Sequence, residues 1–175
     1  MAADFSEASI YVGTYGKYNA GSLFGKWFDL SDFADKDEFM EACAELHKDE
    51  SEPEFMFQDW ENIPEELIGE SWLSEKFFDL RDKVEDMDAT TQEAFSNWLD
   101  YESRDLSKAD ADDLVSKFND EYIGKYDEEE DYAREVIEQC YDLPEFAINY
   151  FDYAAFARDL FCDGYKFLDG FVFHS

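Results

Sequence analysis

The sequence SIYVGTYGKYNAGSLFGKWFD, residues 9–29, contains two runs of aromatic and β-branched residues that are separated by a glycine-rich link. Runs of this composition, bounded by glycine and asparagine, are typical of β-strands. Residues 9–15 and 22–29 are therefore expected to form an antiparallel pair. Gly16, Asn19 and Gly21 are expected to make the hairpin link between the two strands.

A helix and a third strand follow this pair. Residues 54–60, EFMFQDW, alternate apolar and polar side chains, as a half-buried strand does. Residues 36–48 have helical spacing, with three apolar side chains on the inner face: Phe39, Cys43 and Leu46. These elements together predict an N-terminal α+β domain, residues 1–61.

The middle of the chain changes to helical spacing. Residues 63–101 contain no β-like run, and two apolar series predict two helices. The first series is Leu73, Phe77, Leu80 and Val84, and the second is Phe95, Trp98 and Leu99. The second helix is expected to be capped by Asp88 or Thr90, with Glu93 completing a capping box from Thr90. Residues 62–104 are therefore predicted to be an all-α domain.

The remaining residues, 105–175, are predicted to form a second α+β domain. Its first helix has one apolar face, made by Ala111, Leu114, Val115 and Phe118. Residues 122–126 predict a short strand. Residues 164–173 predict a closing hairpin, because Asp169–Gly170 is a strong two-residue turn signal.

Two more helices are expected between that strand and that hairpin. Asp127 is predicted to cap the first, and the acidic residues after it lie where the helix dipole favours negative charge. Its predicted buried stripe consists of Tyr132, Val136, Ile137 and Cys140. Pro144 is expected to begin the second helix, which runs through Asp152 or beyond. The predicted fold class is thus α+β, in three small units of α+β, all-α and α+β character with a strongly acidic surface.

The charge of the chain is extreme for a folded protein. Its 175 residues include 46 Asp and Glu against 14 Lys and Arg, which gives a formal net charge of −32. The chain is nevertheless 45% hydrophobic and 19% aromatic, whereas disordered acidic tails are poor in aromatic residues. Such self-repulsion destabilises a compact protein, so the charge itself is expected to serve the function, which is to bind a basic protein. Nucleic acid and anionic membranes would be repelled.

The charge is concentrated in the middle of the chain. Residues 34–145 hold 38 acidic and ten basic residues, a net charge of −28, while both ends are nearly neutral. Duplex DNA carries one negative charge per roughly 1.7 Å, so the charge of one chain matches roughly 54 Å, or about 16 base pairs. The expected binding surface is formed by acidic residues on the outer faces of the predicted helices. These are Asp37, Glu38, Glu41, Glu45, Glu75, Asp79, Asp82, Glu85, Asp112, Asp113, Asp120, Asp127, Glu128, Glu129, Glu130 and Asp131.

No catalytic, cofactor or metal motif is recognisable. His47 and His174 lie in different predicted domains without a third ligand at metal spacing, and both are expected to be surface or capping residues. We therefore expect no enzyme activity, no cofactor and no metal. Cys43, Cys140 and Cys162 are odd in number and widely spaced, which favours free thiols in a reducing cytoplasm. No apolar run is long enough to span a membrane, and no signal peptide is recognisable at the N-terminus.

Three long segments of the chain resemble the ArdA antirestriction proteins. They are SIYVGTYGKYNAGSLFGKWFDL, ELHKDESEPEFMFQDWENIP and LPEFAINYFDYAAFARDLFCDGY, and the similarity extends over residues 8–173. The resemblance implies a cytoplasmic bacterial protein, encoded on mobile elements, that imitates bent B-form DNA. Its implied partner is the DNA-binding site of type I restriction–modification enzymes.

The resemblance also implies an elongated protomer of three domains that dimerises through the C-terminal domain. The family's short antirestriction motif maps onto residues 142–152, DLPEFAINYFD. Its apolar side chains are interpreted either as a dimer interface or as domain core. The motif positions assigned to this interface are Asp142, Leu143, Pro144, Glu145, Phe146, Ala147, Tyr150, Phe151 and Asp152.

Other functions remain open from the residues alone. An acidic chaperone for a basic protein would share the electrostatics but would not need regularly spaced carboxylates. A hydrolase with two catalytic carboxylates would need a concave pocket with perturbed acids. Adaptation to high salt would explain global acidity, but the abundant Phe, Tyr and Trp speak against it.

Overall fold

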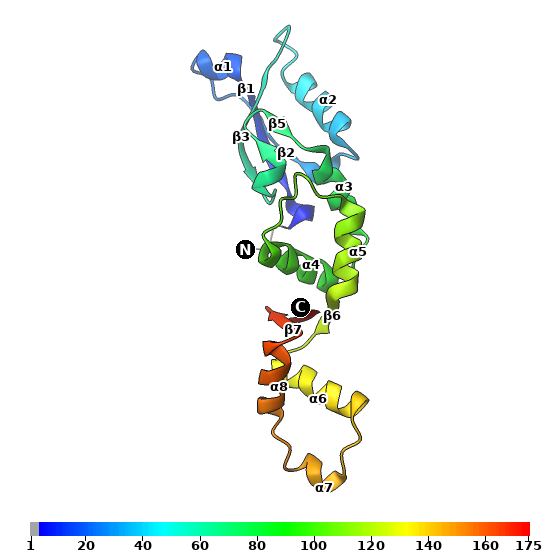
Figure 1. The fold of residues 1–175 in the computed structure, drawn as a ribbon. Coiled ribbons are helices and arrows are strands. Elements are labelled where there is room, and N and C mark those ends of the chain that lie inside the picture. Colours follow the sequence, from blue (N-terminus) through cyan, green and yellow to red (C-terminus); the bar gives the residue numbers. More distant parts are fainter. Residues whose placement is uncertain (1–3) are drawn as a thin grey trace. The chain divides into compact units, whose positions relative to one another are not determined.

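The computed structural model describes residues 4–175 and combines helices with small antiparallel sheets, which confirms the predicted α+β class (Figure 1). The backbone contacts divide the chain into two compact units, the first ending at Leu114 and the second beginning at Val115. Each unit is described by itself below. The predicted division into three domains, with boundaries after residues 61 and 104, stays a prediction.

The first unit contains a three-stranded antiparallel sheet with strand order β2-β1-β3. Its strands are β1 (Ser9–Thr14), β2 (Lys26–Asp29) and β3 (Phe55–Glu61). Ser9 pairs with Asp29 on one side and with Glu61 on the other. Ile10 and Val12 of the central strand are fully buried. All three predicted strands are therefore confirmed.

The link between β1 and β2 differs from the prediction because it contains a short helix, α1 (Tyr15–Asn19). The Thr14 side chain accepts a hydrogen bond from the N–H of Lys17 and so caps this helix. Strand β1 therefore ends at Thr14 and not at Tyr15. Gly21 then adopts a φ of 83°, which is open to glycine and strained for other residues.

Helix α2 (Lys36–Leu46) packs on this sheet as predicted. Asp35 caps it by accepting from the N–H of Glu38. Phe39 and Cys43 are fully buried, and the Phe39 ring lies 6.0 Å from Phe28 of β2 and 5.9 Å from Phe57 of β3. Burial of a side chain such as Phe39 stabilises the fold by about 1.5–3 kcal/mol, so the amphipathic face of α2 forms the core of this sheet.

Two helices and a small ribbon follow β3 in the same unit. They are the ribbon strands β4 (Ile68–Gly69) and β5 (Trp72–Leu73) and the helices α3 (Glu75–Glu85) and α4 (Ala89–Glu102). Asp88, and not Thr90, caps α4, because its carboxylate accepts from the N–H of Thr91. Both predicted helices are confirmed.

The ribbon shows that the prediction of an all-α segment without strands was wrong. Each of its strands has two residues, which is too short for an alternating pattern to appear in the sequence. Gly69 leaves room for the indole of its strand partner Trp72, since a Cβ there would lie 2.2 Å from Nε1 of Trp72.

Arg81 of α3 is a buried basic residue that binds the chain segment after β2. Its guanidinium donates to the backbone carbonyls of Leu30 and Phe33, both at 2.7 Å, and of Ala34, at 2.9 Å. The side chain is almost completely buried and stacks on the Phe78 ring. This one residue therefore binds three backbone carbonyls, of which that of Leu30 also accepts from the N–H of Phe33.

The second unit contains another three-stranded antiparallel sheet, with strand order β6-β8-β7. Its elements after α5 (Ala111–Glu121), which runs across the boundary between the units, are β6 (Tyr122–Lys125), α6 (Glu129–Cys140), α7 (Glu145–Ile148), α8 (Tyr153–Cys162), β7 (Tyr165–Leu168) and β8 (Phe171–His174). Phe118, Phe171 and Phe173 are fully buried. Asp169 and Gly170 have φ of 49° and 91°, which confirms the predicted two-residue hairpin turn.

Three details of the second unit differ from the predictions. Glu128, and not Asp127, is the cap residue of α6, and Cys140 at the end of α6 is exposed. The helix expected from Pro144 through Asp152 is interrupted after Ile148. Asp152 accepts from the N–H of Ala155 and so starts the separate helix α8.

Replacement of Arg81 by Met is expected to lower the free energy of unfolding by about 2–4 kcal/mol. Each buried carbonyl left unpaired costs about 1–3 kcal/mol, and water molecules that reach some of these carbonyls reduce the total cost. Urea unfolding followed by tryptophan fluorescence measures this. The matched control is Lys108→Met, which makes the same charge change at a side chain that is 85% exposed. Equal stability of the two variants would contradict the role of Arg81.

Tyr126 makes the second unit sensitive to alkali. Burial, together with a hydrogen bond from its hydroxyl to Glu135, raises the pKa of Tyr126 to about 12. The pKa of an unfolded tyrosine is about 10, so this stabilisation is present below pH ~10 and is lost as the pH rises through about 12.

The difference in unfolding free energy between the wild type and Tyr126→Phe is therefore expected to shrink between pH 9 and pH 12. Urea unfolding at several pH values measures it, with Tyr141→Phe as the exposed control. A difference that stayed constant over this range would show that Tyr126 does not titrate in the folded unit.

Candidate acidic interface

The acidic residues predicted to bind a partner lie on the outer sides of four helices. Fifteen of the sixteen are exposed, and Glu130 is half-buried. On α2 they are Asp37, Glu38, Glu41 and Glu45; on α3 they are Glu75, Asp79, Asp82 and Glu85; on α5 they are Asp112, Asp113 and Asp120; and at the start of α6 they are Asp127, Glu128, Glu129, Glu130 and Asp131. Each helix thus carries its carboxylates on an ordered backbone.

Helix architecture explains part of this placement. Acidic residues occupy the first turns of α2, α5 and α6, where the helix dipole stabilises negative charge. Glu38 accepts from the N–H of Ala34, and Asp131 accepts from the N–H of Glu128. These two carboxylates therefore stabilise helix starts as well as adding to the charge.

Some of the other carboxylates pair with basic residues of the same chain. The Lys83 ammonium lies 2.6 Å from Asp112, which raises the pKa of Lys83. The Lys48 ammonium lies 2.6 Å from Glu45, and the hydrogen bond raises the pKa of Lys48. Exposed pairs of this kind contribute about 0–1 kcal/mol each, so a cation from another protein competes with them at little cost.

On α2 and α3, four of the predicted carboxylates have no such pairing. Within residues 4–175, no ion pair or hydrogen bond involves the side chains of Asp37, Glu41, Glu75 or Asp79. These four are therefore suitable positions at which to test charge without disturbing the fold.

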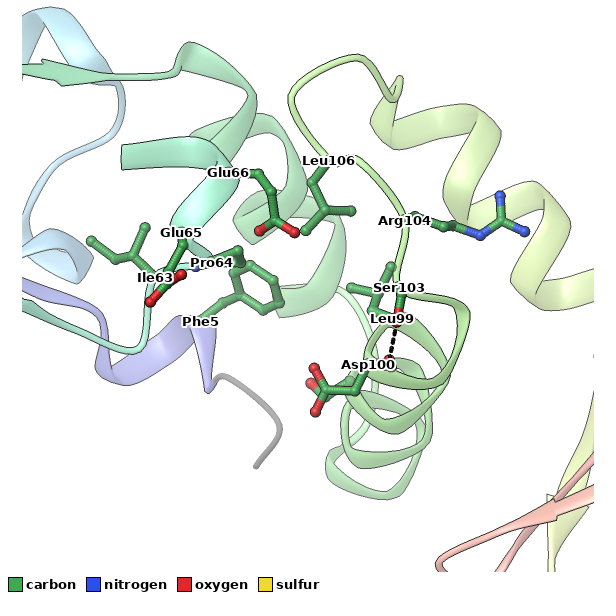
Figure 2. Close-up of a pocket in the computed structure, with 11 residues that line it drawn as sticks. Phe5, Ile63, Pro64, Glu65, Glu66, Leu99, Asp100, Ser103, Arg104 and Leu106 are labelled. Carbon is green, nitrogen blue, oxygen red and sulfur yellow. Dashed lines mark hydrogen bonds between the residues drawn. The ribbon is translucent and has the colours of Figure 1, made fainter. Parts of the chain in front are cut away.

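A pocket of about 570 Å³ in the first unit brings together acidic residues that sequence reasoning missed (Figure 2). Glu65 and Glu66, from the short 3₁₀ turn Glu65–Leu67 after β3, and Asp100, from the last turn of α4, line it. All three are exposed. Glu65 and Glu66 have no place in a helical pattern, so only the folded chain brings them close to Asp100.

The antirestriction motif, residues 142–152, presents aromatic side chains to solvent. Phe146 is 78% exposed and Tyr150 is 76% exposed, and their rings lie 5.1 Å apart. The interpretation of these two residues as domain core is therefore wrong. Phe151 is half-buried and contacts Phe156 of α8.

The remaining positions of the antirestriction motif are likewise either exposed or half-buried. Leu143 and Ala147 are half-buried, whereas Asp142, Pro144, Glu145 and Asp152 are exposed.

His47 is the C-cap residue of α2, which agrees with the expected capping role, but it is not a surface residue because its side chain is fully buried. Its Nδ1 accepts from the Lys17 ammonium at 2.9 Å, since an ammonium only donates, and its Nε2 therefore donates to the carbonyl of Val12 at 3.1 Å. His174 is exposed at the end of β8, as predicted.

The side chains of His47, Asp49 and Glu50 bring three potential metal ligands close together. Lys17 lies among them, 2.8 Å from Asp49 and 3.7 Å from Glu50. Its hydrogen bond holds the pKa of Asp49 below the usual range. The arrangement is therefore that of a half-buried lysine with its own anionic partners.

Among the described residues, no helix is both long and apolar enough to cross a membrane. No curated protein was found to match the chain. The family model for the antirestriction protein ArdA matches residues 10–173, which is nearly the whole chain. The resemblance noted in three segments of the sequence thus extends over both compact units. The chain belongs to the ArdA family of antirestriction proteins.

Proposed function

We propose that this protein inhibits type I restriction–modification enzymes by occupying the DNA-binding groove of their methyltransferase core. Lysine and arginine side chains in such a groove normally contact phosphates. The protein offers carboxylates in their place and so excludes DNA by competition. It needs no catalytic group and no cofactor for this action.

The proposal rests on one observation, which is that many exposed carboxylates are attached to an ordered backbone. Residues 34–145 carry a net charge of −28, and 15 of the 16 predicted carboxylates are exposed on or beside helices whose apolar faces are buried. Ordered carboxylates lose little conformational entropy when they meet a row of basic residues, as DNA phosphates do. A three-domain protomer that imitates B-form DNA belongs to this proposal.

Competition binding tests the proposal directly. A purified type I methyltransferase core is loaded with a fluorescent duplex containing its recognition site, and the protein is titrated in. Stoichiometric displacement of the duplex is expected. If micromolar protein at low salt displaces no duplex, the enzyme is not the target, and an acidic chaperone for another basic protein becomes the better hypothesis.

The acidic surface is expected to act through many weak contacts. The variant Asp37→Asn/Glu41→Gln/Glu75→Gln/Asp79→Asn should bind the core roughly 10- to 100-fold more weakly, because four contacts of at most about 1 kcal/mol each are lost. Each single substitution should weaken binding less than about fivefold. Titration calorimetry without DNA measures both effects.

The matched control removes four charges outside residues 34–145. Glu7→Gln/Asp159→Asn/Asp163→Asn/Asp169→Asn has the same net charge and should bind nearly as well as the wild type. A tenfold loss from any one of the single substitutions would contradict distributed contacts. Equal losses in the two quadruple variants would show that only the total charge matters.

We also propose that the antirestriction motif, residues 142–152, forms a homodimer interface. The variant Phe146→Ser/Tyr150→Ser is expected to sediment as a monomer at concentrations at which the wild type is dimeric. The reason is that the interface loses two exposed aromatic rings. The control, Tyr18→Ser/Leu23→Ser, removes two exposed apolar side chains of the first unit. A variant that remained dimeric, or a monomeric wild type, would overturn this assignment.

A further inference from the structure

The pocket in the first unit combines an apolar wall with a carboxylate rim (Figure 2). Phe5, Leu99 and Leu106 line it and are almost completely buried from solvent. Glu65, Glu66 and Asp100 stand around them and are exposed. Its volume of about 570 Å³ lies within the range of roughly 300–1,000 Å³ typical of ligand sites.

The rim carboxylates have no basic partner in the same chain. Among residues 4–175, no ion pair involves Glu65, Glu66 or Asp100. Arg104 also lines the pocket, but its guanidinium lies 2.9 Å from Glu102. Figure 2 shows it pointing away from the three carboxylates. The field in the pocket therefore favours a cation.

The end of α4 adds to this field. Helix α4 has 14 residues and ends beside the pocket, where Ser103 adopts a φ of 46° and its N–H donates to the carbonyl of Asp100. The C-terminal end of a helix carries a partial negative charge, which attracts cations. The helix end and the side chains thus contribute potential of the same sign.

Other acidic clusters of the first unit contain a cation of their own. A smaller pocket lined by Asp79, Asp82 and Asp112 also contains Lys83, which pairs with Asp112. Lys17 occupies the cluster at His47, Asp49 and Glu50. The pocket at Asp100 differs from both clusters because no such lysine reaches its carboxylates. A cation that neutralises these carboxylates must therefore come from another molecule.

The apolar wall narrows the choice of cation. A metal ion or a free ammonium ion would use only the rim. A lysine or arginine side chain has an aliphatic stem that packs on apolar surface and a charged head that stays at the polar edge. Such a side chain fits both parts of the pocket.

We propose that this pocket binds one lysine or arginine side chain of the target protein, as a localised anchor within the otherwise dispersed acidic surface. This rests on the proposed function, in which the partner presents rows of basic residues. DNA phosphates have no counterpart to such a pocket. The anchor would therefore distinguish this protein from the DNA that it displaces.

A small probe tests the pocket without the restriction enzyme. Nα-acetylarginine methylamide is titrated into the methyl-labelled full chain, with Nα-acetylcitrulline methylamide as the neutral isosteric control. Saturable shifts of the Leu99 and Leu106 methyl signals with the arginine probe are expected, with at least fivefold weaker binding of citrulline. Equal binding of both probes, or no binding at these methyl groups, overturns the proposal.

Binding to the methyltransferase core tests the anchor. The variant Glu65→Gln/Glu66→Gln/Asp100→Asn is compared with Glu41→Gln/Glu75→Gln/Asp79→Asn, which removes the same charge elsewhere on the first unit. The pocket variant is expected to bind at least tenfold more weakly than this control and to lose the arginine response. Equal affinities of the two variants would overturn the anchor while leaving DNA competition intact. A wild type that does not bind the core refutes the proposed function, and the arginine probe still decides the pocket.

Discussion

The structure depends on a balance between aromatic burial and electrostatic self-repulsion. The net charge of −32 favours expansion of the chain, and apolar burial within two compact units opposes it. The sequence accordingly contains 18 Phe and 11 Tyr. Ring contacts join Phe39 to both outer strands of the first sheet, and Phe118 to Phe173 in the second unit. Charge can accumulate on the helices because their inner faces supply this core.

The few basic residues are placed where they stabilise particular structures. Arg81 satisfies three backbone carbonyls, and Lys17 joins the buried His47 to two carboxylates. Lys83 of α3 pairs with Asp112 at the start of α5. These basic side chains are engaged within the chain, so the free carboxylates face solvent with a nearly uniform sign. The proposed interface for a basic partner rests on this division of roles.

Much of the secondary structure could be predicted because its signals are local. The strands β1, β2 and β3, the helices α2, α3 and α4 and the hairpin turn at Asp169–Gly170 follow from periodicity, capping residues and turn chemistry. The errors have equally local reasons. The β4–β5 ribbon is too short to show alternation, the cap at Asp152 divides an expected helix, and Thr14 starts a helix inside an expected hairpin link.

The sequence by itself determined the sign and concentration of the charge, the α+β class and the family, because composition and long segments need no tertiary contacts to be recognised. It also placed the predicted carboxylates on helix faces, since a helix repeats every 3.6 residues. Only the tertiary structure decided that His47 is buried and that Phe146 and Tyr150 are exposed. It alone brought Glu65, Glu66 and Asp100 around one pocket with an apolar wall. Such features depend on residues that are distant in the chain, and their proximity is set by packing rather than by any repeating pattern.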